Sequence, residues 1–264
     1  MTGLTESLTV PRHGVDADAD AYADFRKAGV IVFDQLWPAA RIAELLATLE
    51  TLHPDYVGKV ARRPDDRFEV GDGRFISPLT FAPPFDCADI LLHPTLVRFF
   101  SRALGPKFVF EAIGVISALP GAAAQTLHSD GAWLFGEVGL DRILPAFAMT
   151  VVIPLVAMDA VSGMTALWPG SHLHDRDVDT DPYEAPEIAT GSCAAWDFRL
   201  RHRGLANNGT QARPLLYVTV CRPFWIDHKN FEPGVNAKLL ASRSAVAKLP
   251  EADRKRFMRA RFVD

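Results

Sequence analysis

The chain has 264 residues, 48% of them hydrophobic, which is enough to bury one substantial core, so we expect a single domain over residues 1–264. A net charge of −4 and a pI near 6.1 provide no general attraction for nucleic acid, which is excluded as an expected partner. The longest apolar run, at 146–158, contains Pro154 and is shorter than the ~20 residues that a membrane-spanning helix needs, so no membrane partner is expected.

The cysteines and the first residues predict the compartment. The three cysteines, Cys87, Cys193 and Cys221, are odd in number and include no close pair, which indicates a reducing environment. The N-terminus lacks a basic patch followed by an apolar core, so no secretory signal is expected. We therefore predict a cytoplasmic protein.

Two helices are predicted within residues 16–52. Aspartates at positions 16, 18 and 20 suit the positive end of the first helix, and Gly29 ends it. The second helix covers 39–52, where Pro38 precedes apolar residues that recur at helical spacing. Between the two helices, a β-branched run at 30–33 predicts a short strand. Both helices are expected to cover one face of a sheet.

Residues 53–104 combine a loop, strand-like pieces and a helix. The polar segment 53–66 predicts an exposed loop. Segment 68–85 mixes short strand-like pieces with glycines and prolines. A short helix is predicted at 95–104, because the segment follows a proline and stops at Gly105.

Short strands are expected to dominate residues 106–226. Their number, and the glycines and prolines between them, predict a mainly β fold with flanking helices, either a sandwich or a barrel. The expected strands cover 108–119, 125–128, 132–135, 147–156, 165–168, 193–198 and 215–224.

The C-terminal tail is helical in composition over 237–249 and 251–262, with Pro250 between the two parts. We expect these helices to pack on the β core or against a second subunit. The sequence therefore leaves open whether the protein forms a homodimer.

Three residues predict a metal site. His128-Ser129-Asp130 places an imidazole and a carboxylate where an extended backbone aims both at one ion, and His202 supplies a third ligand. Two imidazoles and one carboxylate form the facial triad of non-heme Fe(II) oxygenases, which leaves metal positions open for cosubstrate and dioxygen. Arg213, eleven residues after His202, can hold a carboxylate through a two-pronged hydrogen bond. A second match, His53-Pro54-Asp55, contains a proline after a helical pattern, and we interpret it as chance.

In these residues the chain resembles the phytanoyl-CoA dioxygenase-like family of Fe(II)/2-oxoglutarate-dependent oxygenases. The matching residues run in the family's order and are Gln125 with His128-x-Asp130, the segment 162–172, Asp197-x-Arg199-x-x-His202-Arg203-Gly204-x-x-Asn207, and Arg213-Pro214. The resemblance implies a double-stranded β-helix, a jelly-roll or cupin-like barrel, with its core at 106–226. The N-terminal helices (16–52) and C-terminal helices (237–262) are then expected to pack on that barrel.

The resemblance also implies the chemistry. Iron is expected at His128, Asp130 and His202, and Arg213 is expected to pair with the distal carboxylate of 2-oxoglutarate, with dioxygen as the oxidant. Related halogenases replace the carboxylate ligand by Gly or Ala to admit chloride. Because Asp130 is present, oxygen chemistry is favoured over halogenation.

Further contacts are predicted around this centre. Gln125 and Thr165 match positions that help to hold the cosubstrate in similar enzymes. The segment 68–85 lies near the substrate in similar enzymes, and aromatic residues flank the metal segments. The predicted substrate contacts are Phe75, Trp133, Phe135 and Phe224. If these aromatic residues line the cavity, the substrate is bulky and partly apolar. The leading hypothesis is a small metabolite from specialised metabolism. An acyl-CoA is disfavoured, because no basic or glycine-rich phosphate cradle is found.

The predicted function is therefore a 2-oxoglutarate-dependent dioxygenase that performs hydroxylation, or alternatively desaturation, epoxidation or ring formation. Two alternatives stay open. One is a catalytically inactive jelly-roll protein that binds a ligand. The other is a cupin-type metalloenzyme that does not use 2-oxoglutarate and holds its metal through His172 and His174. Asp197 and Arg199 are interpreted as a structural ion pair, and Asn207 as a partner of a ligating histidine.

Overall fold

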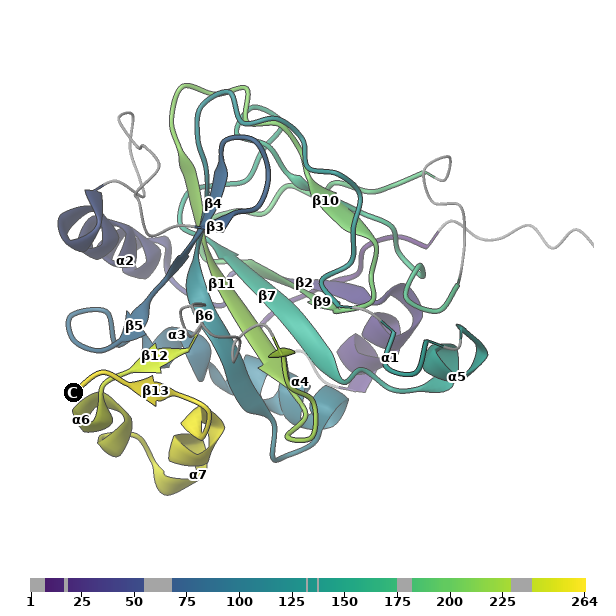
Figure 1. The fold of residues 1–264 in the computed structure, drawn as a ribbon. Coiled ribbons are helices and arrows are strands. Elements are labelled where there is room, and N and C mark those ends of the chain that lie inside the picture. Colours follow the sequence, from purple (N-terminus) through teal and green to yellow (C-terminus); the bar gives the residue numbers. More distant parts are fainter. Residues whose placement is uncertain are drawn as a thin grey trace, which may run out of the picture.

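An eight-stranded sheet is the largest element of the fold (Figure 1). The computed structural model describes residues 8–16, 19–54, 68–131, 133–136, 138–174, 182–228 and 239–264. The strand order is β1-β2-β9-β7-β11-β6-β4-β3. These strands are β1 (Arg12–His13), β2 (Val30–Phe33), β3 (Phe68–Glu69), β4 (Arg74–Pro78), β6 (Val109–Ala118), β7 (Ala148–Pro154), β9 (Cys193–Asp197) and β11 (Arg213–Cys221).

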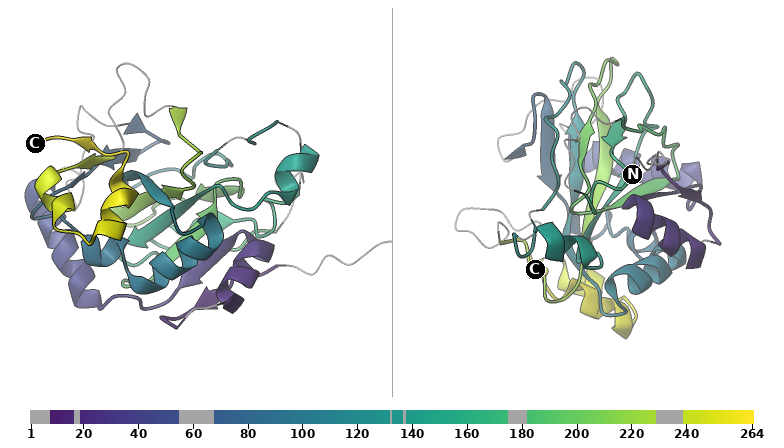
Figure 2. Two further views of the ribbon diagram at one scale, coloured as in Figure 1. Left: turned by 90° about the horizontal axis from the view of Figure 1, so that it is seen from below. Right: turned by 90° about the vertical axis from the view of Figure 1, so that its right-hand side faces the viewer.

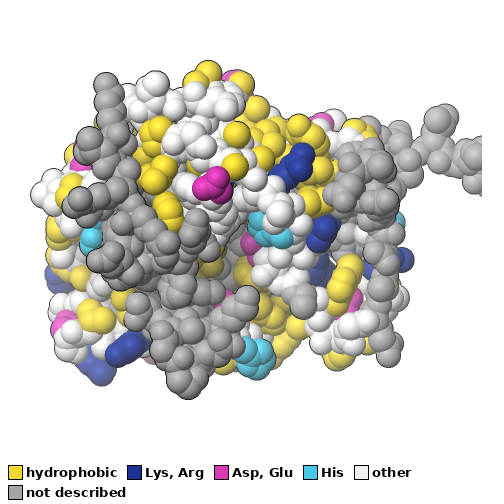
Figure 3. Space-filling view, turned by 45° about the horizontal axis from the view of Figure 1, so that its top comes forward, with side chains coloured by type: hydrophobic (Ala, Val, Ile, Leu, Met, Phe, Trp, Pro, Cys, Tyr) yellow, Lys and Arg dark blue, Asp and Glu magenta, His cyan; other side chains and the backbone are white. Residues whose placement is uncertain are grey.

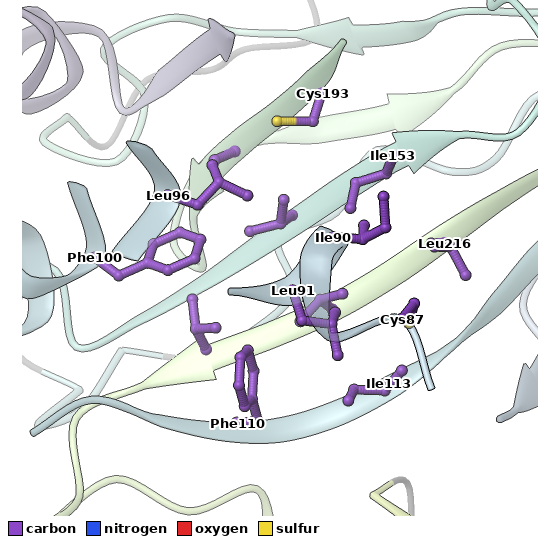
Figure 4. Packing of buried hydrophobic residues seen from close by; sticks show 14 of the residues in the cluster. Cys87, Ile90, Leu91, Leu96, Phe100, Phe110, Ile113, Ile153, Cys193 and Leu216 are labelled. Carbon is purple, nitrogen blue, oxygen red and sulfur yellow. The ribbon is translucent and has the colours of Figure 1, made fainter. Parts of the chain in front are cut away.

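Four helices cover one face of this sheet. They are α1 (Ala19–Ala28), α2 (Ala39–Leu52), α3 (Ala88–Leu91) and α4 (Pro94–Leu104). Residues of a strand alternate between faces, and on β11 Leu216 and Val218 lie in the same buried cluster as the helix residues Leu45 and Phe100. Figure 4 shows part of this cluster between sheet and helices. The helices predicted at 39–52 and 95–104 are confirmed, and so is the first helix over its described residues. The first two helices lie on one face of the sheet, as predicted.

A small two-stranded sheet lies over the other face. It pairs β8 (Thr165–Leu167) with β10 (His202–Gly204), and Figure 1 shows β10 across the large sheet from α1 and α4. A second buried cluster joins Leu167 of β8 to Val152 and Trp196 of the large sheet. The large sheet therefore separates two interiors. One is apolar and lies under the helices, and the other lies between the two sheets.

The described strands form separate sheets and do not close into the predicted barrel. The physical reason lies in the segment 125–128, which was expected to be a full strand. It pairs with β10 only by an isolated bridge between His128 and His202, and by a 2.9 Å hydrogen bond from Gln125 N to Gly204 O. The small sheet therefore stays narrow.

The strand predicted at 132–135 is wrong for its described part, residues 133–135. The backbone N–H groups of Leu134 and Phe135 donate to the buried carboxylate of Asp141, at 2.8 and 3.1 Å, and are not available to a sheet partner. Asp141 belongs to a short helix that was not predicted, α5 (Val138–Ile143). A side-chain acceptor thus replaces the strand ladder by a turn.

The C-terminal tail is less helical than predicted. Its elements are β12 (Leu240–Ala241), α6 (Arg243–Ala247), α7 (Glu251–Arg254), a 3-10 turn (Lys255–Phe257) and β13 (Arg261–Phe262). β12 pairs with β13 and with β5 (Thr80–Phe81), and these pairs shorten the helices. Phe257 is buried against Phe81 and Phe110, so the tail packs on the main core, as Figure 2 shows for the yellow segment. No helix in the described ranges is both long and apolar enough to cross a bilayer.

Candidate active site

The structure brings the three predicted metal ligands together. His128 N donates to His202 O at 3.0 Å and His202 N donates to His128 O at 2.8 Å, so the backbones hold the two residues opposite each other. Their ring centroids are 4.4 Å apart, and Asp130 Oδ1 lies 3.5 Å from His202 Nε2. One ligand atom from each residue lies within 4.8 Å of the others, close enough for one ion to be bound by all three.

Both imidazoles are oriented by backbone carbonyl groups. His128 Nδ1 donates to Thr126 O at 2.8 Å, and His202 Nδ1 donates to Leu200 O at 3.0 Å. A carbonyl oxygen only accepts, so each Nδ1 carries the proton and each Nε2 is left as the metal-binding atom. The predicted partner Asn207 is not involved, because its Nδ2 donates to Ala118 O at 3.0 Å and thereby fixes a loop.

The carboxylate of Asp130 is held from one side. Its Oδ2 accepts hydrogen bonds from Thr150 Oγ1 at 2.6 Å and from Trp196 Nε1 at 2.9 Å. Both donors lie on neighbouring strands, β7 and β9, in directly paired positions. Oδ2 is therefore occupied, and Oδ1 is left facing His202 as a single ligand atom.

Charge in the triad favours an ionised acid. Burial alone would raise the pKa of Asp130, but the charge of His202 and the hydrogen bonds from His202, Thr150 and Trp196 hold it well below its usual value. Burial, followed by the charge of His202, lowers the pKa of His128. Burial would also lower the pKa of His202, yet Asp130 outweighs it and raises that pKa. A cation at this point would replace the proton that Asp130 attracts to His202.

Removing the Thr150 donor should weaken metal binding. Thr150→Val keeps the shape of the side chain but leaves Asp130 Oδ2 with one donor, so the carboxylate is free to turn. We expect Fe(II) affinity, measured anaerobically by calorimetry, to fall roughly 10- to 100-fold, the usual effect of losing such a partner. Thr150→Ser keeps the hydroxyl and should bind as the native protein does. Equal Fe(II) affinity of Thr150→Val and Thr150→Ser would show that the Thr150 hydroxyl does not support metal binding.

A cavity of about 580 Å³ contains the triad and extends between the two sheets. Arg213 lies in it with only 2% of its surface exposed. Its Nε donates to Ser162 O at 3.2 Å, whereas its Nη1 is buried and has no hydrogen-bond partner within the described part of the chain. Burial, and then the nearby charge of Arg74, lower the pKa of Arg213 to about 9. A buried cation with a free donor fits a carboxylate ligand.

Arg74 is a second buried cation of this cavity, and it was not predicted from the sequence. Ala118 of β6 pairs with Arg213 on one side and with Arg74 on the other. The two arginines therefore lie level with each other on the two strands that flank β6. Burial lowers the pKa of Arg74 to about 10. A Cβ at Gly204 would lie 2.6 Å from Arg74 Nη1, so a side chain at this position would force the guanidinium to shift. Nothing local in the sequence marks Arg74, since its position depends on sheet register.

The two remaining cosubstrate candidates also line the cavity. Gln125 Nε2 donates to Val70 O at 2.7 Å, and its Oε1 accepts from Gly204 N at 3.0 Å. Its amide is therefore tied to backbone on both sides of the cavity. Thr165, at the start of β8, is almost fully buried there.

The four predicted substrate contacts do not line this cavity. Phe75 is buried on the opposite face of β4, because its neighbours on either side point into the cavity and strand residues alternate. Phe135 and Phe224 are 61% and 70% exposed, and Trp133 lines a smaller cavity. The aromatic residues that do line the large cavity are Trp196, Phe198 and Tyr217. Figure 3 shows a face on which histidine, acidic and basic side chains lie close together among hydrophobic ones.

Two further predictions concern residues near the triad. Asp197 and Arg199 form the predicted ion pair, with Arg199 Nη2 2.7 Å from Asp197 Oδ2 and both side chains 2% exposed. His172, the alternative metal ligand, is buried against α1, with its Nε2 3.2 Å from Arg26 O. In the described ranges, His128, Asp130 and His202 are the only cluster of potential metal ligands.

Comparison with known proteins gives three kinds of match. A model of the phytanoyl-CoA dioxygenase (PhyH) family matches residues 25–215. The multifunctional dioxygenase ausE of Aspergillus calidoustus is 24% identical over 235 residues, which cover 80% of this chain and 78% of that protein. Among solved structures, HygX from Streptomyces hygroscopicus with nickel and 2-oxoglutarate bound has a TM-score of 0.61 at 13% identity, over 80% of this chain and 89% of that one. The non-heme α-ketoglutarate-dependent epimerase SnoN from nogalamycin biosynthesis has a TM-score of 0.58 at 17% identity, over 83% and 90% of the two chains.

Proposed function

The chain belongs to the phytanoyl-CoA dioxygenase family, and we propose that it is an oxygenase whose Fe(II) is held by His128, Asp130 and His202. The observation that carries the proposal is the meeting of these three ligands in one cavity with the free Nη1 of Arg213. Binding of a ligand alone would need neither the three convergent metal ligands nor a buried guanidinium whose Nη1 has no partner among the described residues. The inactive jelly-roll alternative is therefore disfavoured.

The arginines support one orientation of the cosubstrate. 2-Oxoglutarate has a keto acid at one end, suited to the metal, and a carboxylate at the other, suited to a guanidinium. Arg213 provides that guanidinium, and Arg74 adds a second positive charge beside it. Iron, dioxygen and 2-oxoglutarate together supply the oxidising chemistry, with release of succinate and carbon dioxide. The protein's own part is to fix the ligands and to keep the cosubstrate's charge buried.

The rest of the cavity supports a substrate that is small and partly apolar. Its volume lies in the ordinary range for small-molecule sites, roughly 300–1,000 Å³. Trp196, Phe198 and Tyr217 supply aromatic surface beside the triad. The SnoN and SnoK structures come from nogalamycin biosynthesis, which supports a role in specialised metabolism. Hydroxylation, desaturation, epoxidation and ring formation are all compatible with this lining.

The finer fold assignment is part of the same proposal. The large sheet faces β8 and β10 across the cavity, which is the arrangement expected of a double-stranded β-helix. The cupin-type alternative loses its support, because His172 is held at the end of α1 and outside the cavity.

Anaerobic titration with Fe(II) and 2-oxoglutarate tests the function. We expect the weak visible charge-transfer band of a metal-bound keto acid in the native protein. In Arg213→Gln the band should need roughly 10- to 100-fold more 2-oxoglutarate, because a charge-assisted hydrogen bond is worth ~1.5–3 kcal/mol. Arg203→Gln is the matched control, since Arg203 lies over Trp168 and Tyr183 and does not line the cavity. Folded native protein without a band would overturn the proposal.

A further inference from the structure

A second cavity lies behind the metal segments. It has a volume of about 250 Å³ and is lined mainly by polar side chains. Its lining residues are Ser129, Gly131, Trp133, Ser171, His174, Arg199 and Arg201. Ser129 also lines the large cavity, so the two cavities adjoin at that residue, which lies between the ligands His128 and Asp130.

Two arginines line this second cavity, and only one of them is available to a ligand. The guanidinium of Arg199 is paired with Asp197 and also donates to Leu144 O at 3.2 Å. The guanidinium of Arg201 forms neither a hydrogen bond nor an ion pair with any residue that the structure describes. Arg201 thus brings an uncompensated positive charge to a polar cavity.

The backbone fixes the direction in which Arg201 points. Its N–H donates to Ser171 Oγ at 2.9 Å, and its carbonyl accepts from Trp168 N at 3.1 Å. His202 follows directly and lines the large cavity, so strand alternation turns Arg201 to the other side. Burial and His202 are the main causes that lower the pKa of His128, and the charge of Arg201 adds to them. Arg201 therefore lies within electrostatic reach of the metal site.

We propose that the second cavity binds an anionic group of the substrate, a carboxylate, sulfate ester or phosphate monoester, through the guanidinium of Arg201, while the carbon to be oxidised lies in the large cavity beside the triad. This inference rests on the proposed function, because it concerns the substrate of the same site. One free guanidinium suits a single anionic group. The substrate class is then a small, partly apolar acid, in contrast to an acyl-CoA with its several phosphates.

Anion binding by the metal-free protein tests the cavity without any need for catalysis. Inorganic sulfate is the probe, and calorimetry at low ionic strength gives its affinity. We expect native protein and Arg203→Gln to bind sulfate alike, and Arg201→Gln to bind it at least about 10-fold more weakly, because a charge-assisted hydrogen bond is lost. Arg203 is a matched control, since it lies two residues away and its guanidinium is placed over Trp168. Equal binding by both variants would overturn the proposal.

Pairs of candidate metabolites test the link to the substrate. Each pair consists of a small aromatic or alicyclic acid and its methyl ester, and the measurement is substrate-triggered turnover of 2-oxoglutarate. The acids should stimulate 2-oxoglutarate turnover by the native protein and by Arg203→Gln. In Arg201→Gln this stimulation should be at least about 10-fold smaller. The esters should have the same effect on all three proteins. Preference for the esters in native protein would overturn the inference.

These results are separable from the test of the proposed function. An intact charge-transfer band, with 2-oxoglutarate affinity unchanged in Arg201→Gln, would show that the metal and cosubstrate sites are sound. Loss of sulfate binding in that variant then supports the anion site by itself. Absence of the band in native protein would instead remove the proposed function, whatever the sulfate result.

Discussion

His202→Ala is expected to abolish specific Fe(II) binding and 2-oxoglutarate turnover. The residue is 4% exposed and offers one of the three convergent ligand atoms, and its backbone pairs with that of His128. Losing a residue that only orients a metal ligand already lowers metal affinity roughly 10- to 100-fold. Losing the ligand itself should therefore lower Fe(II) affinity by more than about 100-fold. Fe(II) affinity measured anaerobically, and succinate release measured by chromatography, both report the change.

A distant histidine provides the control for this variant. His13 lies on β1 at the edge of the large sheet, and its Nε2 is 3.0 Å from Asp24 Oδ2. His13→Ala removes an imidazole without touching the cavity, and it should leave metal affinity and turnover at native values. Unchanged Fe(II) affinity in folded His202→Ala would show that the metal is held elsewhere.

Asp197→Ala is expected to lower the free energy of unfolding by about 3–5 kcal/mol, the usual cost of removing one partner of a buried ion pair. The carboxylate accepts three hydrogen bonds from Arg199, at 2.9 Å from the backbone N–H and at 2.8 and 2.7 Å from the guanidinium. After truncation, Arg199 would stay buried with no carboxylate partner among the described residues, and only backbone carbonyls and the ring of Phe147 would contact its guanidinium. Urea unfolding at neutral pH measures the difference.

An exposed ion pair supplies the comparison. Lys255 and Glu251 are 3.4 Å apart at i, i+4 spacing, with side chains 77% and 82% exposed. Glu251→Ala should cost less than about 1 kcal/mol, since solvent screens the pair. A similar loss of stability in the two variants would mean that burial of the Asp197–Arg199 pair contributes nothing of its own.

Residues that act through local spacing were predicted correctly. His128 and Asp130 stand two apart in the chain, and so do Asp197 and Arg199, so the chemistry of each pair is visible in the sequence. Helices could also be predicted, because their apolar spacing and their end residues are local signals.

Errors arose where a distant group decided the outcome. Phe75 was expected in the cavity, but the pairing of β4 with β6 turns it to the opposite face. The expected strand near Leu134 became a turn because the carboxylate of Asp141 takes its N–H group. In both cases the deciding contact is made by another element, and local residue preference carries no information about it.

The sequence by itself determined which residues could hold a metal ion and which guanidinium could meet a carboxylate, because donor chemistry belongs to the residue type and the spacing is short. Only the tertiary structure decided that Arg74 lies beside Arg213, that Thr150 and Trp196 hold one oxygen of Asp130, and that Arg201 faces a second cavity. These contacts depend on strand register and on the face to which each side chain points. Both are set by packing across the whole sheet, where a shift of one residue would reverse them.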